Sequence, residues 1–130
     1  MQAEQKKYRI LVAEDNDFVR MQMVKYLRDD GYDVSDFYTA ADAVTASHDH
    51  YDLAVLDVRM EPMGGFEFIK SMRSNNIETP AILVTGDSSP DLLSEASHMG
   101  VSAVLIKPVQ RDRLLKTVSK TIQREERRSG

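Results

Sequence analysis

The chain has 130 residues, of which 42% are hydrophobic, and this is enough for one globular domain with a substantial core. The mild formal net charge of −4 gives no reason to expect direct binding to nucleic acid or to a membrane surface. Cysteine is absent, which excludes disulfides and thiolate zinc sites. No apolar run could span a bilayer, and the polar residues 1–7 lack the apolar stretch of a signal peptide. We therefore expect one cytoplasmic domain preceded by a disordered segment, residues 1–7.

The first part of the chain predicts two strands, each followed by a helix. Residues 8–13 form a short apolar run without polar alternation, which is typical of a parallel strand covered on both faces. A helix is expected between the capping residue Asn16 and Gly31, where it ends. A weaker strand follows around residues 32–38, and Thr39 opens a second helix.

The rest of the chain continues this alternation. Three further apolar runs have the same strand character, and the segments after them have helical spacing, with a proline at the first position of the fourth helix. The predicted strands are 53–56, 81–84 and 102–106, and the predicted helices are 66–72, 89–100 and one from about residue 110 to beyond 122.

The regular order of strands and helices predicts an α/β fold with a doubly wound parallel sheet and right-handed crossovers. Four of the strands end at polar or charged side chains that are unusual in a core. In an open parallel sheet, the carboxyl ends of the strands meet at one edge, and ligands bind there. This edge would gather three carboxylates, a hydroxyl and an ammonium, from Glu14, Asp15, Asp57, Thr85 and Lys107.

Taken singly, these residues have ordinary structural explanations. Asp57 could be a turn former or a helix cap, Thr85 a strand-end hydroxyl and Lys107 a surface lysine. Their combination is harder to explain in this way, because clustered carboxylates raise one another's pKa unless a cation intervenes. Oxygen ligands without His or Cys suit a hard ion, so the pattern favours Mg²⁺.

This set of residues, in this order on successive strands and with Pro108 after the lysine, resembles the receiver domain of bacterial two-component response regulators. The loop from Asp57 to Gly65 is similar to the signature that follows the phosphorylated aspartate of that family. The resemblance covers the chain from Tyr8 to Ile122. It implies a chemotaxis-regulator-like, flavodoxin-like fold: a five-stranded parallel sheet of order 2-1-3-4-5 with helices on both faces. The receiver domain would span residues 8–124, followed by a charged tail or the start of a linker at 125–130. The charged residues 124–128 are most simply a solvated helix end.

The resemblance also implies a role for each carboxylate of the set. Asp57 would be the phosphoacceptor, and Glu14 and Asp15 would be the acidic pair that holds Mg²⁺ together with Asp57. The backbone carbonyl of Arg59 would complete the protein's share of the coordination. A carboxylate can act as a nucleophile toward phosphorus, and the reaction asks mainly for positioning and for nearby positive charge.

Other positions would assist the transfer. Thr85 would bond the phosphoryl oxygens, Lys107 would pair with them, and the peptide bond before Pro108 would be cis. Gly86, being small, leaves room for the phosphodonor. Asp87 is expected to form an ion pair with Arg59 at the mouth of the site, which would restrict water and prolong the life of the phosphoryl group.

Two positions depart from the family pattern. Glu61 stands where the family more often has its loop proline, and Pro62 follows it. Val104 stands three residues before Lys107, where many receivers have an aromatic residue that rotates inward on activation. Because Val has no ring to relocate, the signal is expected to pass through the loop 85–90 and the helix after it. A partner or a second copy would sense the change on the face made by that helix, the last strand and the last helix.

The leading hypothesis is therefore a signalling switch that takes a phosphoryl group from a histidine kinase or a phosphotransfer protein, not a classical enzyme. A phosphatase of the haloacid dehalogenase type is less favoured, since such enzymes need a second Asp where this chain has Arg59. A phosphate-independent interaction module would have no need for the acidic pair and Lys107. The output and the cognate kinase are unknown, and the chain is either a stand-alone receiver or part of a larger regulator or hybrid kinase.

Overall fold

The computed structural model describes residues 7–61 and 63–129 of the chain. The predicted disordered segment lies outside the described residues except for Lys7, and so does Pro62 of the signature loop. Five strands and five helices alternate along the described part of the chain, as the sequence predicted. The strands are β1 (Arg9–Ala13), β2 (Asp33–Phe37), β3 (Leu53–Asp57), β4 (Ala81–Thr85) and β5 (Ala103–Ile106). The helices are α1 (Asp17–Asp29), α2 (Ala40–Ala46), α3 (Gly65–Ser74), α4 (Pro90–His98) and α5 (Arg111–Ser129).

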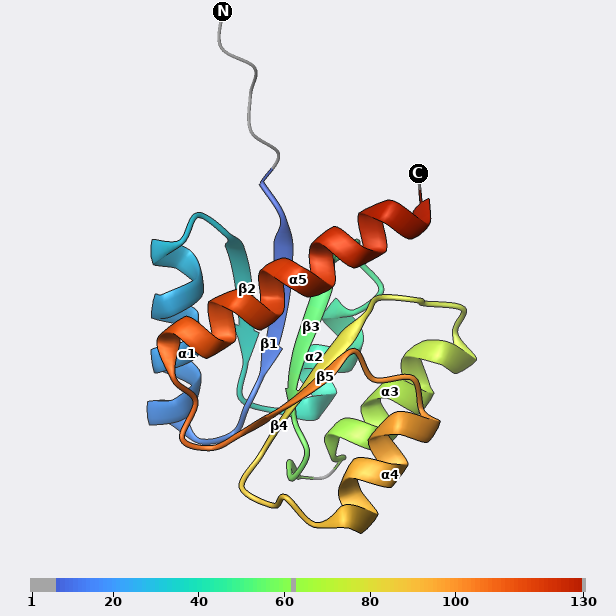
Figure 1. Cartoon of the computed structure of the whole chain (residues 1–130). Coiled ribbons are helices and arrows are strands. Elements are labelled where there is room, and N and C mark those ends of the chain that lie inside the picture. Colours follow the sequence, from blue (N-terminus) through green and yellow to red (C-terminus); the bar gives the residue numbers. More distant parts are fainter. Residues whose placement is uncertain (1–6, 62, 130) are drawn as a thin grey trace, which may run out of the picture.

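The strands form one parallel sheet in the order β2-β1-β3-β4-β5, which confirms the order that the resemblance implied. Helices α1 and α5 pack on one face of the sheet, and α2, α3 and α4 pack on the other (Figure 1). The doubly wound α/β fold is therefore confirmed. Because all the strands run in the same direction, their carboxyl ends lie along one edge of the sheet.

The hydrophobic core has two layers, one on each side of the sheet. Val12 and Val55 belong to the layer beneath α1 and α5, whereas Leu11 and Leu56 belong to the layer beneath α2, α3 and α4. Every residue of the central strands β3 and β4 is buried. A strand that is covered on both faces alternates between two apolar layers, and this explains why these runs show no polar alternation.

The two edge strands are less buried than the central ones. The sequence predicted that residues 102–106 would be covered on both faces, but in β5 Ala103 and Val104 are only half-buried and Ile106 is 42% exposed. Strand β5 pairs only with β4 and lies at the border of the sheet, where the flanking helices cover it incompletely. An apolar run alone does not distinguish a central strand from such an edge strand.

Helix α5 runs farther than the predicted domain limit. It continues to Ser129, which agrees with the expectation that the charged residues 124–128 form a solvated helix end. The Tyr8 hydroxyl donates a hydrogen bond to Glu126 Oε1 at 2.7 Å, which ties the end of this helix to the chain just before β1. The domain limits 8–124 stay a prediction.

The start of α3 packs closely against the end of β3. A Cβ atom added at Gly65 would lie 2.8 Å from the carbonyl oxygen of Asp57 and 2.9 Å from Leu83 Cδ2. These distances are shorter than ordinary van der Waals contacts, so a side chain at this position requires one of the neighbours to move. The absence of a side chain at Gly65 therefore lets the helix approach the backbone that carries Asp57.

We expect Gly65→Ala to lower the free energy of unfolding by about 1–3 kcal/mol, because the new methyl group has no space. Gly86→Ala is the matched control. A Cβ there has no heavy atom within 4 Å, so stability should change by less than about 1 kcal/mol. Urea denaturation measures both changes. Equal stability of the two variants would contradict the close packing at Gly65.

Candidate functional site

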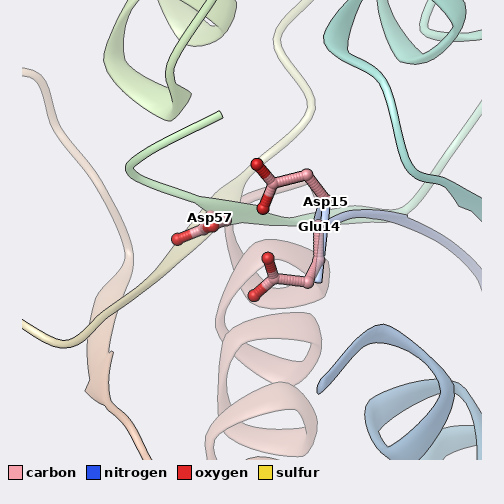
Figure 2. A group of neighbouring side chains, drawn as sticks. All are labelled: Glu14, Asp15 and Asp57. Carbon is pink, nitrogen blue, oxygen red and sulfur yellow. The ribbon is translucent and has the colours of Figure 1, made fainter. Parts of the chain in front are cut away.

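The ends of four strands bring the predicted site residues together. Asp57 is the last residue of β3 and Thr85 the last residue of β4, while Glu14 follows the end of β1 and Lys107 follows the end of β5. Figure 2 shows the side chains of Glu14, Asp15 and Asp57 grouped at this edge. One carboxylate oxygen from each of these three residues lies within 4.8 Å of the others. The juxtaposition that the sequence predicted is present in the structure.

The three carboxylates lie at different depths. Glu14 is fully buried, Asp57 is 4% exposed, and Asp15 is exposed at the mouth of the site. A cavity of about 580 Å³ opens in front of Asp57. Its lining residues are Asp15, Asn16, Asp57, Arg59, Thr85, Gly86, Asp87 and Lys107.

Lys107 supplies positive charge inside the cluster. Its Nζ lies 2.8 Å from Glu14 Oε1 and 3.4 Å from Asp57 Oδ1. Burial disfavours the charged ammonium, but the contacts with Glu14 and Asp57 outweigh it and raise the pKa of Lys107. The lysine is therefore protonated at neutral pH. The peptide bond between Lys107 and Pro108 is cis, as predicted.

Burial and neighbouring carboxylates raise the pKa of both members of the acidic pair, Glu14 and Asp15. Burial raises the pKa of Glu14, and its proximity to Asp57 raises it further, although Lys107 acts in the opposite direction. Burial and the neighbouring Glu14 also raise the pKa of Asp15. The buried Glu14 Oε1 is close to Lys107 but has no hydrogen bond of suitable geometry among the described residues. Three carboxylates with one ammonium thus fit a hard divalent cation such as Mg²⁺, which would relieve their repulsion.

The loop after β4 links Thr85 to the start of α4. Thr85 Oγ1 accepts a hydrogen bond from the backbone N–H of Asp87 at 3.0 Å. Asp87 Oδ1 accepts one from the N–H of Ser89 at 2.8 Å, and the Ser89 side chain caps the helix by accepting from Leu92. Val104 lies beside this region on β5, opposite Leu83. A continuous set of hydrogen bonds therefore joins the site to α4.

Arg59 and Asp87 form the expected ion pair at the mouth of the cavity. The distance between Arg59 Nη2 and Asp87 Oδ2 is 3.6 Å, and the arginine side chain is 79% exposed. The backbone N–H of Arg59 also points toward Asp57 Oδ1, at 3.4 Å. The role of the Arg59 backbone carbonyl as a metal ligand stays a prediction.

One residue that contacts the acidic pair was not predicted from the sequence. Arg20, in the first turns of α1, donates a hydrogen bond from Nη1 to the backbone carbonyl of Glu14 at 2.9 Å. An arginine on an amphipathic helix is ordinarily a surface residue, and no motif marked this one. Its guanidinium is also held by Asp36 of β2, and the local sequence does not reveal that β2 lies beside β1.

The fold and this acidic edge define a class of phosphoacceptor signalling domains, and the comparison with known proteins agrees. The model of the family described as the response regulator receiver domain matches residues 10–119, and the chain belongs to this family. Receiver domains are signalling domains rather than classical enzymes, and they generally bind Mg²⁺ in an acidic pocket. They interact with histidine kinases or phosphotransfer proteins, and they occur alone or within larger regulators and hybrid kinases.

Particular relatives illustrate this range. The chain is 30% identical over 118 residues to the transcriptional regulatory protein PdtaR of Mycobacterium tuberculosis, a match that covers 89% of this chain and 57% of that protein. It is 27% identical over 117 residues to the chemotaxis protein CheY of Bacillus subtilis, covering 88% of this chain and 98% of CheY. The signal receiver domain of a Luxo repressor protein from Vibrio parahaemolyticus superposes with a TM-score of 0.89 at 26% identity, over 95% of this chain and 96% of that one. The chain thus spans little more than half the length of PdtaR.

Among the described residues, no helix is both long enough and apolar enough to cross a membrane.

We expect Asp15→Asn to raise the thermal unfolding midpoint of the metal-free protein by about 1–3 °C, because it removes one of three repelling carboxylates. The effect is small since solvent screens the exposed Asp15. Millimolar Mg²⁺ should raise the midpoint of the unmodified protein and have much less effect on the variant. Differential scanning calorimetry in EDTA and in Mg²⁺ measures both.

Asp49→Asn is the control for this comparison, because it removes an exposed carboxylate outside the site. It should leave the response to Mg²⁺ unchanged. A variant at Asp15 that still gains the full stabilisation from Mg²⁺ would exclude Asp15 as a ligand.

Proposed function

We propose that this chain is a phosphorylation-activated switch that accepts a phosphoryl group on Asp57 from a histidine kinase or a histidine phosphotransfer protein, with Mg²⁺ as cofactor. The observation that carries the proposal is the position of Asp57. Its carboxylate belongs to the acidic cluster, contacts the Lys107 ammonium and borders the open cavity. It is therefore the carboxylate of the cluster that combines access to a donor with nearby positive charge.

In the proposed transfer, a carboxylate oxygen of Asp57 forms a bond to phosphorus while the phosphorus–nitrogen bond of the donor phosphohistidine breaks. The electron pair of that bond remains on the imidazole nitrogen, which then takes a proton. Bound Mg²⁺ would supply positive charge to the phosphoryl oxygens. Glu14, Asp15 and Asp57 would hold the ion, with the backbone carbonyl of Arg59 as the further ligand that the family resemblance implies.

Two other side chains would stabilise the transferred group. Lys107 would move from its present contacts to pair with a phosphoryl oxygen, since its ammonium already lies 3.4 Å from Asp57 Oδ1. The Thr85 hydroxyl accepts a hydrogen bond but donates none among the described residues. Its proton is therefore available for a phosphoryl oxygen. Gly86 leaves the approach open, because nothing lies within 4 Å of the space that a Cβ would occupy.

Incubation with acetyl phosphate and Mg²⁺ should add one phosphoryl group to the protein and none to Asp57→Asn. Intact-protein mass spectrometry measures the addition, and the adduct should be labile to hydroxylamine, as an acyl phosphate is. EDTA should suppress it. Asp49→Asn is the control and should be phosphorylated like the unmodified protein. An adduct of full yield in Asp57→Asn, or in EDTA, would exclude the proposal.

The Arg59–Asp87 ion pair is proposed to slow loss of the phosphoryl group by restricting the approach of water. Its energetic contribution to stability is small, on the order of 0–1 kcal/mol, because the arginine is exposed. A steric effect on water does not depend on that energy. The pair spans residues from the loops after β3 and β4, and so it lies across the cavity in front of Asp57.

We expect the phosphorylated protein to lose its phosphoryl group faster when both partners are removed in Arg59→Ala, Asp87→Ala. Release of inorganic phosphate after removal of the donor measures the rate. Asp87→Asn is a sharper test, because the amide oxygen can still accept from the N–H of Ser89 while the ion pair is lost. Unchanged or slower release in the double variant would exclude this role.

The output is proposed to pass from Thr85 through the loop to α4 and from there to the face formed by α4, β5 and α5. Val104 replaces the aromatic residue of many receivers, so no ring rotation is available.

In the phosphorylation experiments, beryllofluoride can mimic the phosphoryl group for NMR. Its backbone shift changes should concentrate between Thr85 and Met99 and around Lys107. A partner protein or a second copy of the chain would bind this face.

A further inference from the structure

Arg20 occupies an unusual environment for an arginine of an amphipathic helix. Its side chain is 11% exposed, and each nitrogen of the guanidinium has its own acceptor. Nε donates to Asp36 Oδ2 at 3.1 Å, Nη2 donates to Asp17 Oδ1 at 2.6 Å, and Nη1 donates to the backbone carbonyl of Glu14 at 2.9 Å. The guanidinium carbon also lies 5.7 Å from the centre of the Tyr38 ring. One side chain thus joins α1, β2 and the segment that follows β1.

The hydrogen bond from Arg20 holds the peptide group that joins the two residues of the acidic pair. The carbonyl of Glu14 belongs to the planar peptide unit between Glu14 and Asp15, so holding it restricts the backbone positions from which both side chains extend. The N–H of Glu14 donates to the carbonyl of Phe37 at 3.1 Å. The two backbone polar groups of Glu14 are therefore held separately, the N–H by the end of β2 and the carbonyl by Arg20.

Neighbouring carboxylates balance the charge of Arg20, so it can lie beside the acidic pair. A lone cation beside the acidic pair would oppose the binding of a second cation. Here Asp17 and Asp36 pair with the guanidinium, so its charge is balanced by groups other than Glu14 and Asp15. Burial disfavours the charged form, but the hydrogen bonds to Asp17 and Asp36 outweigh it and raise the pKa of Arg20. The guanidinium is a permanent hydrogen-bond donor to the Glu14 carbonyl.

We propose that Arg20 is a positioning residue of the metal site: its guanidinium holds the Glu14 carbonyl and thereby orients the Glu14 and Asp15 carboxylates for a divalent cation. The inference rests on the proposed function, in which these carboxylates bind Mg²⁺. A lysine cannot replace Arg20, because a single ammonium nitrogen cannot reach three acceptors that the planar fork of a guanidinium meets separately.

The test compares the Mg²⁺ dissociation constant of the full chain with those of Arg20→Met, Arg20→Lys and two controls, by isothermal titration calorimetry. Both variants at Arg20 should bind Mg²⁺ about tenfold more weakly, the usual effect of removing a group that orients a metal ligand. Asp36→Asn removes one ion pair of Arg20 but leaves its donor to Glu14, and the dissociation constant should change less than about twofold. Val24→Ala, a core truncation elsewhere on α1, should lower stability without weakening Mg²⁺ binding.

A second measurement is independent of the metal. In the metal-free protein, the carbonyl ¹³C resonance of Glu14 should move in Arg20→Lys and Arg20→Met and stay near its original position in Asp36→Asn, because only the first two lose the hydrogen bond to that carbonyl. This readout applies even where one variant at Arg20 does not fold, since the other can be examined.

The outcomes separate the positioning role from the proposed function. Normal Mg²⁺ affinity in either variant at Arg20, or full rescue by lysine, would overturn the positioning role while leaving the metal site intact. Mg²⁺ binding equally weak in Val24→Ala would also overturn it, because general destabilisation would then explain the loss. Failure of the unmodified protein to bind Mg²⁺ would overturn the metal part of the proposed function, and the positioning role with it.

Discussion

The crowding of like charge at one edge of the sheet is the constraint on which the rest of the structure depends. Parallel pairing places Asp57 and the residues after β1 side by side, and their carboxylates come within 4.8 Å. Repulsion and burial both disfavour this arrangement. The fold tolerates it because β3 and β4 are buried along their whole length and Lys107 offsets part of the charge. The repulsion is therefore confined to the acidic edge, and the core beneath it is apolar and buried.

Much of this edge could be predicted from the sequence for a simple physical reason. A central parallel strand is apolar on both faces, so its last residue stands out when it is charged. Asp57 was found in this way, and Thr85 was found at the end of the next run. The strand order was a different matter, since it came from the resemblance to a family and not from the periodicity. Periodicity finds elements, whereas the pairing of β1 with both β2 and β3 is a long-range property.

The parts that the sequence did not reveal depend on tertiary distances. Lys107 lies closer to Glu14 than to Asp57, and no spacing along the chain indicates which carboxylate a lysine will approach. Arg20 also pairs with Asp36, which β2 brings next to α1 across 16 residues of sequence. The exposure of Ile106 depends on the place of β5 at the border of the sheet. In each case a neighbour in space, not in sequence, decides the environment.

The same arrangement explains how a change at Asp57 could reach a distant surface without an aromatic switch. Thr85 Oγ1 holds the N–H of Asp87, and the Asp87 carboxylate holds the N–H of Ser89, the residue that caps α4. A Thr85 hydroxyl drawn toward a phosphoryl group would strain the first of these hydrogen bonds, and the next two would carry the displacement to the helix. The loop is exposed on its outer side, so it has freedom to move that the buried strands lack. Rigid strands fix the acidic edge, and the short polar loop beside it is the element able to respond.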